Sequence, residues 1–349
     1  MRSEIGSEFH WDPAVLTGGG NDLPAGRLFA TGCGALSELL RMLGPAGRLH
    51  VPSYFCMGVA EALSERTPIA WYRHLPDGRG PRWETLRVRD GDVVLAQNLF
   101  GREGRQYGPL WRAWIRAHPG IPVIEDHSHD PISDWARRSE AAYAVASLRK
   151  TLPVPDGGLL WSPRGLPLPS PRGPESTGAH LKLAAMLLKA AWRDGRPIDK
   201  EQFRSLQQQG EHELLGSHGP ACAFTRAALP VMDVAGIRAA GRDNVREVER
   251  LLSTRTGQGM KVWGDGPFRL QLECPTSPVR DALQAHLADH RIYAPVHWRQ
   301  ERGRLWSGDH DAAELAGRFL TLPVDHRCGP GDLSRIAEVV QSFAPALAA

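Results

Sequence analysis

The sequence predicts an α/β protein: a three-layer αβα domain built on a mostly parallel sheet, followed by a small C-terminal α+β domain. In the first half, short apolar runs alternate with segments whose apolar residues recur at helical spacing, which is the pattern of βαβ units. Toward the C-terminus, a strictly alternating strand and amphipathic helices replace that pattern. We therefore expect an N-terminal arm (1–25), a large domain (26–237) and a small domain (238–349).

The strands of the predicted sheet are short apolar runs that follow a polar, Gly-rich arm. The runs expected to form buried strands are RLHVP (48–52), PIAWY (68–72), DVVLAQN (92–98), PVIED (122–126) and YAVAS (143–147). Helical spacing of apolar residues predicts helices over 35–43 and, less regularly, over 109–118.

The second half begins with a Pro-rich segment, SPRGLPLPSPRGPES, which predicts a surface loop. Helices are expected over 178–193, 200–208 and 233–254. FRLQLEC (268–274) alternates apolar and polar residues and predicts a half-exposed strand. Asp332 is expected to cap the last helix, whose apolar stripe runs from Leu333 to Phe343.

Composition excludes several classes of protein. The chain has 349 residues, 42% of them hydrophobic, and its 42 basic against 39 acidic residues leave a net charge of +3. This balance predicts neither a nucleic-acid nor a membrane partner. Five scattered cysteines argue against a disulfide framework or a structural zinc site, and no apolar leader is evident. We expect a soluble, cytoplasmic protein.

The octapeptide VIEDHSHD (123–130) lies at the carboxyl end of a predicted strand, where open α/β sheets bind ligands. Three interpretations are open. The segment could be a polar strand end with solvated histidines, a metal site using Asp126, His127 and His129, or the seat of an organic cofactor.

Two further segments carry possible chemistry. In Ser147-Leu148-Arg149-Lys150, a lysine ends a buried strand; burial would lower its pKa, as a Schiff-base lysine requires. A plain exposed strand end is the alternative. Thr31-Gly32-Cys33-Gly34-Ala35 opens a predicted helix with small residues, whose backbone N–H groups could bind a phosphate or simply form a turn.

In this order, the three segments resemble the fold-type I pyridoxal-phosphate enzymes, most closely the DegT/DnrJ/EryC1/StrS aminotransferase family. Other segments of the chain resemble that family as well and extend the resemblance over residues 27–343. They are RLHVPSYF (48–55), QNLFG (97–101), IYAPVHW (292–298) and FLTLPVDHRCGPGDLSRIAEVV (319–340).

The resemblance implies a role for each matching residue. Lys150 would form the internal aldimine with pyridoxal 5'-phosphate, and Asp126 would keep the pyridine nitrogen protonated. His129 would contact the ring hydroxyl. The residues implied to bind the phosphate are Ser147, Gly32 and Cys33.

On the substrate side the resemblance is less regular. Strict alignment places Cys56 where the family has a ring-stacking aromatic. We expect Phe55 to stack instead, because an aromatic face packs on a pyridine ring better than a thiol does; Tyr54 is the adjacent alternative. His297 and Arg299 could face the substrate.

Two features depart from the family's pattern. The lysine follows the serine by three residues instead of five, as in other fold-type I enzymes. The Asn-x-Arg-Met segment, with which the partner subunit reaches the cofactor, is not intact in AFTRAALPVMD, where Arg226 is its remnant. This second departure puts a nucleotide-sugar substrate in doubt.

The family implies a homodimeric biosynthetic aminotransferase that moves an amino group from an amino donor to a keto-sugar or another small carbonyl metabolite. A pyridoxal-phosphate lyase, racemase or carbon–carbon bond-forming enzyme would use the same lysine and acid. Two hypotheses from other functional classes remain: a metal-dependent hydrolase using Asp126, His127 and His129, and a cofactor-free binding protein on the same scaffold.

Overall fold

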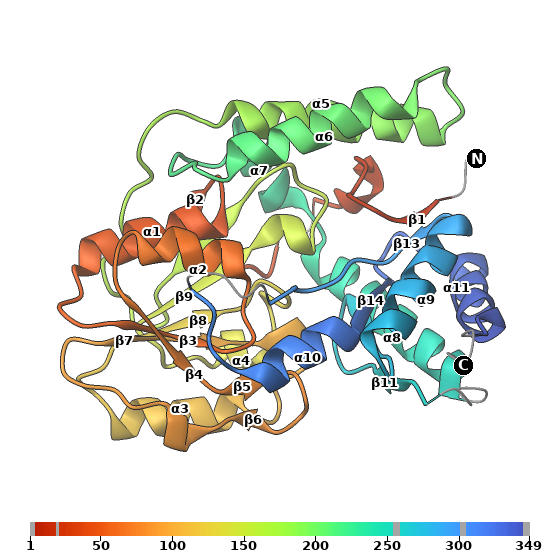
Figure 1. Ribbon diagram of the computed structural model, residues 1–349. Coiled ribbons are helices and arrows are strands. Elements are labelled where there is room, and N and C mark those ends of the chain that lie inside the picture. The colour runs from red at the N-terminus through yellow and green to blue at the C-terminus, as the bar shows by residue number, and fades with distance from the viewer. Residues whose placement is uncertain (1–3, 19–20, 254–258, 301–304, 345–349) are drawn as a thin grey trace. The chain divides into compact units, whose positions relative to one another are not determined.

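The computed structural model describes residues 4–18, 21–253, 259–300 and 305–344. The chain divides into two compact units, drawn in Figure 1. Among the described residues, unit 1 is made of Glu8–Ser53 and Gly58–Ala235, and unit 2 is made of 4–7, Tyr54–Met57 and 236–344. The finer division into 1–25, 26–237 and 238–349 stays a prediction.

A seven-stranded sheet forms the centre of unit 1 in the part of the chain that the structure describes. Its order is β2-β10-β9-β8-β7-β3-β4; β10 runs antiparallel to both neighbours and the other pairs are parallel. The strands are β2 (Arg27–Phe29), β3 (Leu49–Pro52), β4 (Ile69–Tyr72), β7 (Val93–Gln97), β8 (Val123–Asp126), β9 (Tyr143–Ser147) and β10 (Gly158–Trp161). The mostly parallel sheet predicted from the alternating pattern is confirmed.

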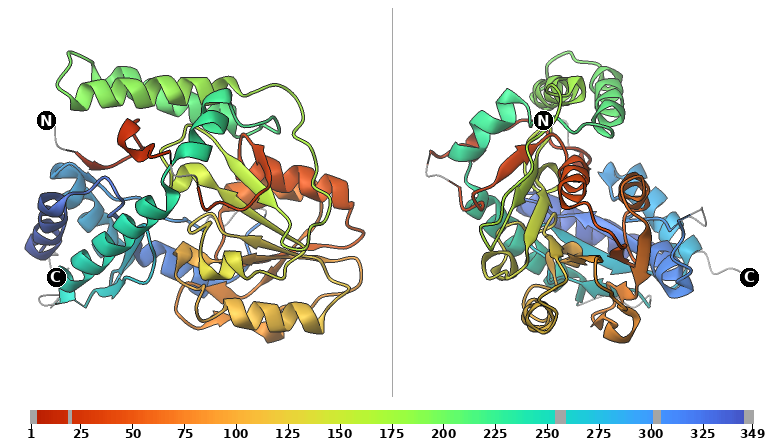
Figure 2. Two further views of the ribbon diagram at one scale, coloured as in Figure 1. Left: turned by 180° about the vertical axis from the view of Figure 1, so that it is seen from behind. Right: turned by 90° about the vertical axis from the view of Figure 1, so that its left-hand side faces the viewer.

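Helices cover both faces of this sheet (Figure 2). On one face, α1 (Gly32–Leu43) packs on β9 and β10. On the other, α3 (Gly108–Ala117) buries Trp111 against strand residues such as Val94 and Val123. The other elements between residues 13 and 150 are short. They are η1 (Pro13–Val15), α2 (Met57–Ser64), β5 (His74–Leu75), β6 (Gly80–Pro81), η2 (Trp83–Thr85), η3 (Leu99–Gly101), α4 (Asp134–Arg137) and η4 (Leu148–Lys150).

A long helical hairpin follows the Pro-rich loop (Figure 1). It consists of α5 (Thr177–Arg193), capped by Ser176, and α6 (Lys200–Leu214), and it precedes α7 (Ala223–Ala228) and η5 (Leu229–Val231). The second helix continues six residues beyond the predicted end at 208, through Gly210. A glycine at this position weakens the helical pattern in the sequence. In the structure its missing side chain lets α6 pack closely against α5.

Unit 2 is α+β, as predicted. Its described part contains an antiparallel sheet in the order β11-β12-β14 and a short parallel pair between β1 and β13. Its elements are β1 (Ile5–Gly6), α8 (Val234–Ser253, which begins in unit 1), β11 (Lys261–Trp263), β12 (Arg269–Glu273), α9 (Ser277–Asp289), β13 (Ile292–Tyr293), α10 (His310–Arg318), β14 (Phe319–Pro323) and α11 (Pro330–Ser342). Leu270, Leu272 and Ile336 lie in its apolar core.

Two sequence predictions for unit 2 are wrong in detail. The strand over 268–274 is not half-exposed, because Gln271 on its polar face is fully buried between Trp263 and Thr321 in the sheet register. Gly329, not Asp332, occupies the cap of α11; Asp332 sits one turn in and its carboxylate accepts the Gly329 N–H at 3.0 Å. That bond satisfies the N–H of the cap residue, as the N3 side chain of a capping box does.

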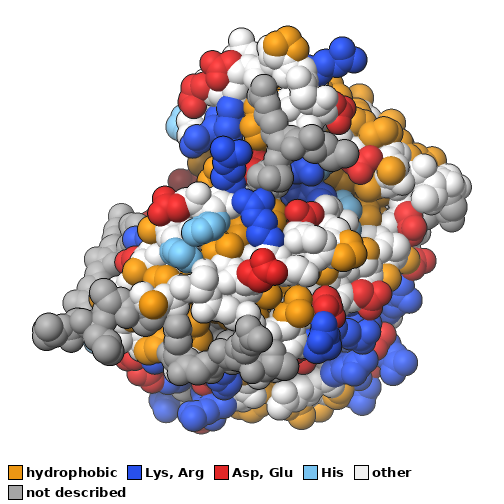
Figure 3. Space-filling view, turned by 90° about the vertical axis from the view of Figure 1, so that its right-hand side faces the viewer, with side chains coloured by type: hydrophobic (Ala, Val, Ile, Leu, Met, Phe, Trp, Pro, Cys, Tyr) orange, Lys and Arg blue, Asp and Glu red, His pale blue; other side chains and the backbone are white. Residues whose placement is uncertain are grey.

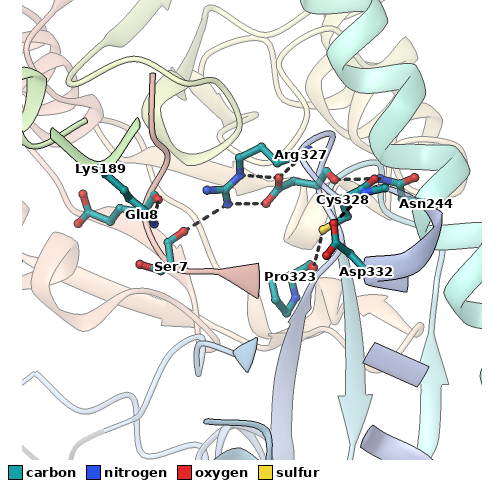
Figure 4. Close-up of polar contacts among 10 residues, drawn as sticks. Ser7, Glu8, Lys189, Asn244, Pro323, Arg327, Cys328 and Asp332 are labelled. Carbon is teal, nitrogen blue, oxygen red and sulfur yellow. Dashed lines mark hydrogen bonds and ion pairs between the residues drawn. The ribbon is translucent and has the colours of Figure 1, made fainter. Parts of the chain in front are cut away.

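A buried ion pair holds the turn between β14 and α11 (Figure 4). The Asp325 carboxylate accepts two hydrogen bonds from Arg327, from Nε at 2.7 Å and Nη2 at 2.8 Å. Asn244 donates to the Asp325 carbonyl at 2.8 Å and the Cys328 carbonyl at 3.2 Å. Burial opposes ionisation of Asp325, but Arg327 outweighs it and holds the pKa of this carboxyl well below its usual range.

The surface carries mixed charge. On the face drawn in Figure 3, basic and acidic side chains are interspersed with apolar ones, in keeping with the near-balanced composition. Among the described residues, none of the helices is both long enough and apolar enough to cross a bilayer.

Candidate functional site

The carboxyl ends of β8 and β9 bring two predicted residues to one face of the sheet. Asp126 is in register with Gln97 on one side and Val145 on the other. Because side chains alternate along a strand, Ser147, two residues after Val145, faces the same way as Asp126. A Cβ added to Gly32 would lie 3.3 Å from the Ser147 Cβ, so this is the face that α1 covers.

The Asp126 carboxylate is nearly buried and only partly satisfied. One oxygen accepts the Ser128 N–H at 2.9 Å, whereas the other lies 3.5 Å from the Gln97 amide nitrogen, which is a weak contact. Within the described chain, the Gln97 side-chain oxygen has no hydrogen-bond partner. A carboxylate with spare acceptor capacity suits the protonated nitrogen of a pyridine ring.

The start of α1 forms a cradle that only small residues allow. The Thr31 hydroxyl caps the helix by accepting the Gly34 N–H at 2.9 Å, and the backbone N–H groups of the first helical turn point toward the N-terminal end of the helix. Any Cβ at Gly158 would collide with the Thr31 carbonyl. Backbone N–H groups at the positive end of a helix beside the Ser147 hydroxyl fit a phosphate.

Lys150 follows directly after this face. It ends η4, the single 3-10 turn that continues from β9. Its side chain is partly exposed, so it is less buried than the sequence position at a strand end implied. The turn is held by backbone bonds from Leu148 N–H to Gly157 C=O at 2.8 Å and from Thr151 N–H to Leu148 C=O at 3.0 Å.

His129 is held in one orientation. Its Nδ1 accepts the Phe100 N–H at 3.0 Å, and its ring stacks on the Phe100 ring with centroids 5.5 Å apart. Because Nδ1 accepts, a neutral ring carries its proton on Nε2, which is therefore a donor.

Two contributors were not recognised as functional from the sequence. Gln97 contacts Asp126, and the Ser128 hydroxyl accepts the Ser147 N–H at 2.9 Å, which ties the ends of β8 and β9 together. Both lie within segments singled out for other residues, QNLFG and VIEDHSHD. Only strand register could have revealed their roles.

The octapeptide does not form a metal site. His127 points to the opposite face from Asp126, where it bonds Glu125 at 3.0 Å and packs against Trp135 and Trp161; both members of the pair are fully buried. Asp126, His127 and His129 therefore do not converge on one point. Within the described ranges, no group of three or more His, Cys, Asp or Glu side chains could hold a metal ion.

The predicted ring-stacking residues belong to unit 2. Tyr54 and Phe55 are both buried; the Tyr54 hydroxyl donates to the His297 carbonyl, and the Phe55 carbonyl accepts from Gln300 at 2.9 Å. Which of the two would stack on a cofactor stays a prediction.

His297 is engaged on both ring nitrogens within unit 2. Arg269 Nη1 lies 3.0 Å from Nε2, and Thr321 Oγ1 lies 2.9 Å from Nδ1. A guanidinium can only donate, so Nε2 accepts and Nδ1 carries the proton. Burial lowers the pKa of Arg269 to about 10, with Asp325 opposing, so Arg269 is still a cation at neutral pH.

Two other arginines singled out in the sequence pair with acidic residues. The Arg299 side chain is 65% exposed and 3.9 Å from Asp281, a solvent-facing position. Arg226 pairs with Glu175 at 2.8 Å on the loop before α5. Substrate roles for His297 and Arg299 stay predictions.

No family model matches the sequence, and no curated protein matches it either. Solved structures do. DesI with its TDP-sugar product has a TM-score of 0.63 at 16% identity, covering 94% of this chain and 81% of DesI. The putative sugar aminotransferase Spr1654 from Streptococcus pneumoniae, in its PLP form, has a TM-score of 0.61 at 12% identity, covering 97% and 92%.

A third similar structure belongs to the family that the sequence resembles. It is a DegT DnrJ EryC1 StrS aminotransferase from Brucella abortus, with a TM-score of 0.57 at 14% identity, covering 93% of this chain and 87% of that one. The chain has the fold of these aminotransferases. In the aminotransferase fold, the face that holds Asp126 and Ser147 lies at the carboxyl ends of parallel strands, where this sheet architecture binds its ligands.

Proposed function

We propose that this protein is a pyridoxal-phosphate-dependent aminotransferase that acts on a keto-sugar or another small carbonyl metabolite. The observation that carries the proposal is the strand register that sets Asp126 and Ser147 on the α1 face, with Lys150 in the next turn. Two enzymes of the same fold, DesI with a TDP-sugar product and Spr1654 in its PLP form, support the cofactor and the substrate class.

The chain's residues have distinct tasks in this proposal. Asp126 would accept a hydrogen bond from the protonated pyridine nitrogen, and His129 would donate from Nε2 to the ring hydroxyl. Donors to the phosphate are the Ser147 hydroxyl and the N–H groups of Gly32 and Cys33. When bound, pyridoxal phosphate supplies an aldehyde that carries amino groups and a ring that accepts an electron pair.

Lys150 holds the cofactor through its ε-amine and moves the proton at the reacting carbon of donor and acceptor. As the sequence resemblance implies, Phe55 or Tyr54 would stack on the ring, and His297 and Arg299 would contact the substrate. In the net reaction the donor exchanges its amino group and one hydrogen for the acceptor's carbonyl oxygen. No external oxidant or reductant is therefore needed.

The decisive experiment compares absorbance spectra of purified wild type and Lys150→Ala, with Lys261→Ala as the control for loss of an exposed lysine. We expect a visible band, and a borohydride-stable adduct on Lys150, in wild type and control. The Lys150 variant should have neither. A wild type without the band, or an adduct on another lysine, would reject the proposal.

A half-reaction separates aminotransferase from lyase or carbon–carbon bond-forming chemistry. Incubation with glutamate and no acceptor should release about one equivalent of oxo acid per site, because an aminotransferase must keep the amino group until an acceptor arrives. Continuous product release without an acceptor would instead indicate one of the other pyridoxal-phosphate reactions.

We also propose that the protein works as a homodimer. Light scattering of the purified chain should give about twice the 38.3 kDa mass of one chain. A monodisperse monomer would contradict this part of the proposal.

A further inference from the structure

An ion-pair network joins the α5–α6 hairpin to the turn that carries Lys150. Glu211 of α6 forms a two-pronged pair with Arg149, with Oε2 at 2.9 Å from Nη1 and Oε1 at 2.7 Å from Nη2. The same carboxylate accepts from Lys182 of α5 at 2.7 Å. Lys182 also lies 3.0 Å from Glu8. Arg149 is the residue immediately before Lys150.

The hairpin is built to bring Glu211 to this position. Gly178 and Gly210 face each other across the two helices: a Cβ at Gly178 would lie 2.5 Å from the Gly210 carbonyl. A Cβ at Gly210 would lie 2.8 Å from the Gly178 carbonyl and 2.6 Å from the Lys182 Cγ. Because neither position carries a side chain, the helices approach closely enough for Lys182 to reach Glu211.

Each of the two cations that contact Glu211 and Glu8 has a carboxylate partner. Arg149 and Lys182 are matched by Glu211 and Glu8, and the Lys182 side chain is only 5% exposed. Burial raises the pKa of Glu211, but the two cations lower it further, so its net shift is downward and it is ionised at neutral pH. A two-pronged guanidinium–carboxylate pair fixes orientation as well as distance.

We propose that Glu211 is a positioning residue for Lys150: through its pair with Arg149, the α5–α6 hairpin sets the conformation of η4 and hence the direction of the Lys150 amine. This inference rests on the proposed function of Lys150. The η4 turn is only three residues long, and its backbone is held by the bonds from Leu148 N–H to Gly157 C=O and from Thr151 N–H to Leu148 C=O. A side-chain anchor at Arg149, its second residue, therefore restricts the turn further.

The pair should act as one unit. Removing either Glu211 or Arg149 breaks the same anchor, so a second removal should add little, whereas independent effects would multiply. The matched control is Glu213→Gln, which makes the same charge change on the same helix at a residue that contacts Gln209 at 2.9 Å.

The test measures how fast apo-protein captures pyridoxal phosphate on Lys150, by borohydride quenching at set times and peptide mapping. Glu211→Gln and Arg149→Gln should each slow capture by about tenfold, within the range of couplings between contacting residues. The double variant should be no slower than either single variant, and Glu213→Gln should match wild type. Hydrogen exchange on apo-protein should rise over 148–152 in Glu211→Gln while β8 keeps its protection.

The outcomes separate this inference from the proposed function. If wild type forms no adduct on Lys150, the proposed function fails, and hydrogen exchange over 148–152 still reports whether Glu211 orders the turn. If wild type forms the adduct and Glu211→Gln captures cofactor at the wild-type rate, the positioning role is wrong. If Glu211→Gln lowers the free energy of unfolding but leaves the capture rate unchanged, Glu211 stabilises the fold and does not position Lys150.

Discussion

At the scale of single residues, two neighbouring carboxylates of β8 have different tasks: we assign Asp126 to the proposed chemistry and Glu125 to stability. Asp126 faces α1 with spare acceptor capacity, and Glu125 faces the other side, fully buried against His127. The two carboxylates are adjacent in the chain, yet alternation along a strand sends them into different environments.

We predict opposite phenotypes for the two amide variants. Asp126→Asn should lower turnover by about 100-fold or more, the size typical of losing a preorganised electrostatic partner, with little change in unfolding free energy. Glu125→Gln should lower the unfolding free energy by about 1–3 kcal/mol, because it weakens a buried hydrogen bond, and keep turnover per folded molecule. Urea unfolding and initial rates on the same preparations check both. Equal loss of activity in the two variants would contradict this division.

At the scale of secondary-structure elements, glycine decides how the hairpin packs. An exposed glycine in a helix normally costs stability, and alanine gains up to about 1 kcal/mol there. At Gly178 and Gly210 the added methyl group instead meets backbone of the opposite helix.

We therefore predict that Gly178→Ala and Gly210→Ala each destabilise the protein by about 1–3 kcal/mol, the usual cost of overpacking. The control is Gly58→Ala in α2, where a Cβ meets nothing within 4 Å and the substitution should be neutral or stabilising. Thermal and urea unfolding of the three variants provide the measurement. Stabilisation by alanine at 178 or 210 would show that the helices are not in close contact.

At the scale of the whole molecule, the ion pair between Asp325 and Arg327 should contribute to the dependence of stability on acid. The pKa of Asp325 is lowered on folding, against a usual value of about 3.9 in unfolded chains. A depressed carboxyl pKa contributes stability above the unfolded value, and this contribution is lost as the pH falls toward the folded value.

Asp325→Asn should accordingly destabilise the protein at pH 7 by about 1.5–3 kcal/mol, as expected for hydrogen bonds to a charged group. The difference from wild type should shrink as the pH falls from about 4 toward 2, because in that range the unfolded wild-type chain binds a proton at Asp325 that the folded protein does not bind. Urea unfolding at several pH values tests this. A difference that stays constant across that range would mean that the ion pair contributes nothing that depends on pH.

Much of the fold could be predicted because the information is local. Periodicity located β3, β4, β7, β8 and β9 within a residue or two of their observed bounds. It placed α6 six residues short, since Gly210 resembles a helix end in sequence. It also misjudged the strand around Gln271, because burial of a polar face depends on what packs over it.

For the candidate site, the order of three short motifs along the chain was enough to predict the fold and to select Lys150, Asp126 and Ser147. Chain order limits which strand ends can meet at one edge of a parallel sheet, so colinear motifs carry information about space. The tertiary structure alone decided that His127 pairs with Glu125 behind the sheet and that Glu211 reaches Arg149. Both depend on strand register and helix packing, which join residues distant in sequence and leave no periodic trace in it.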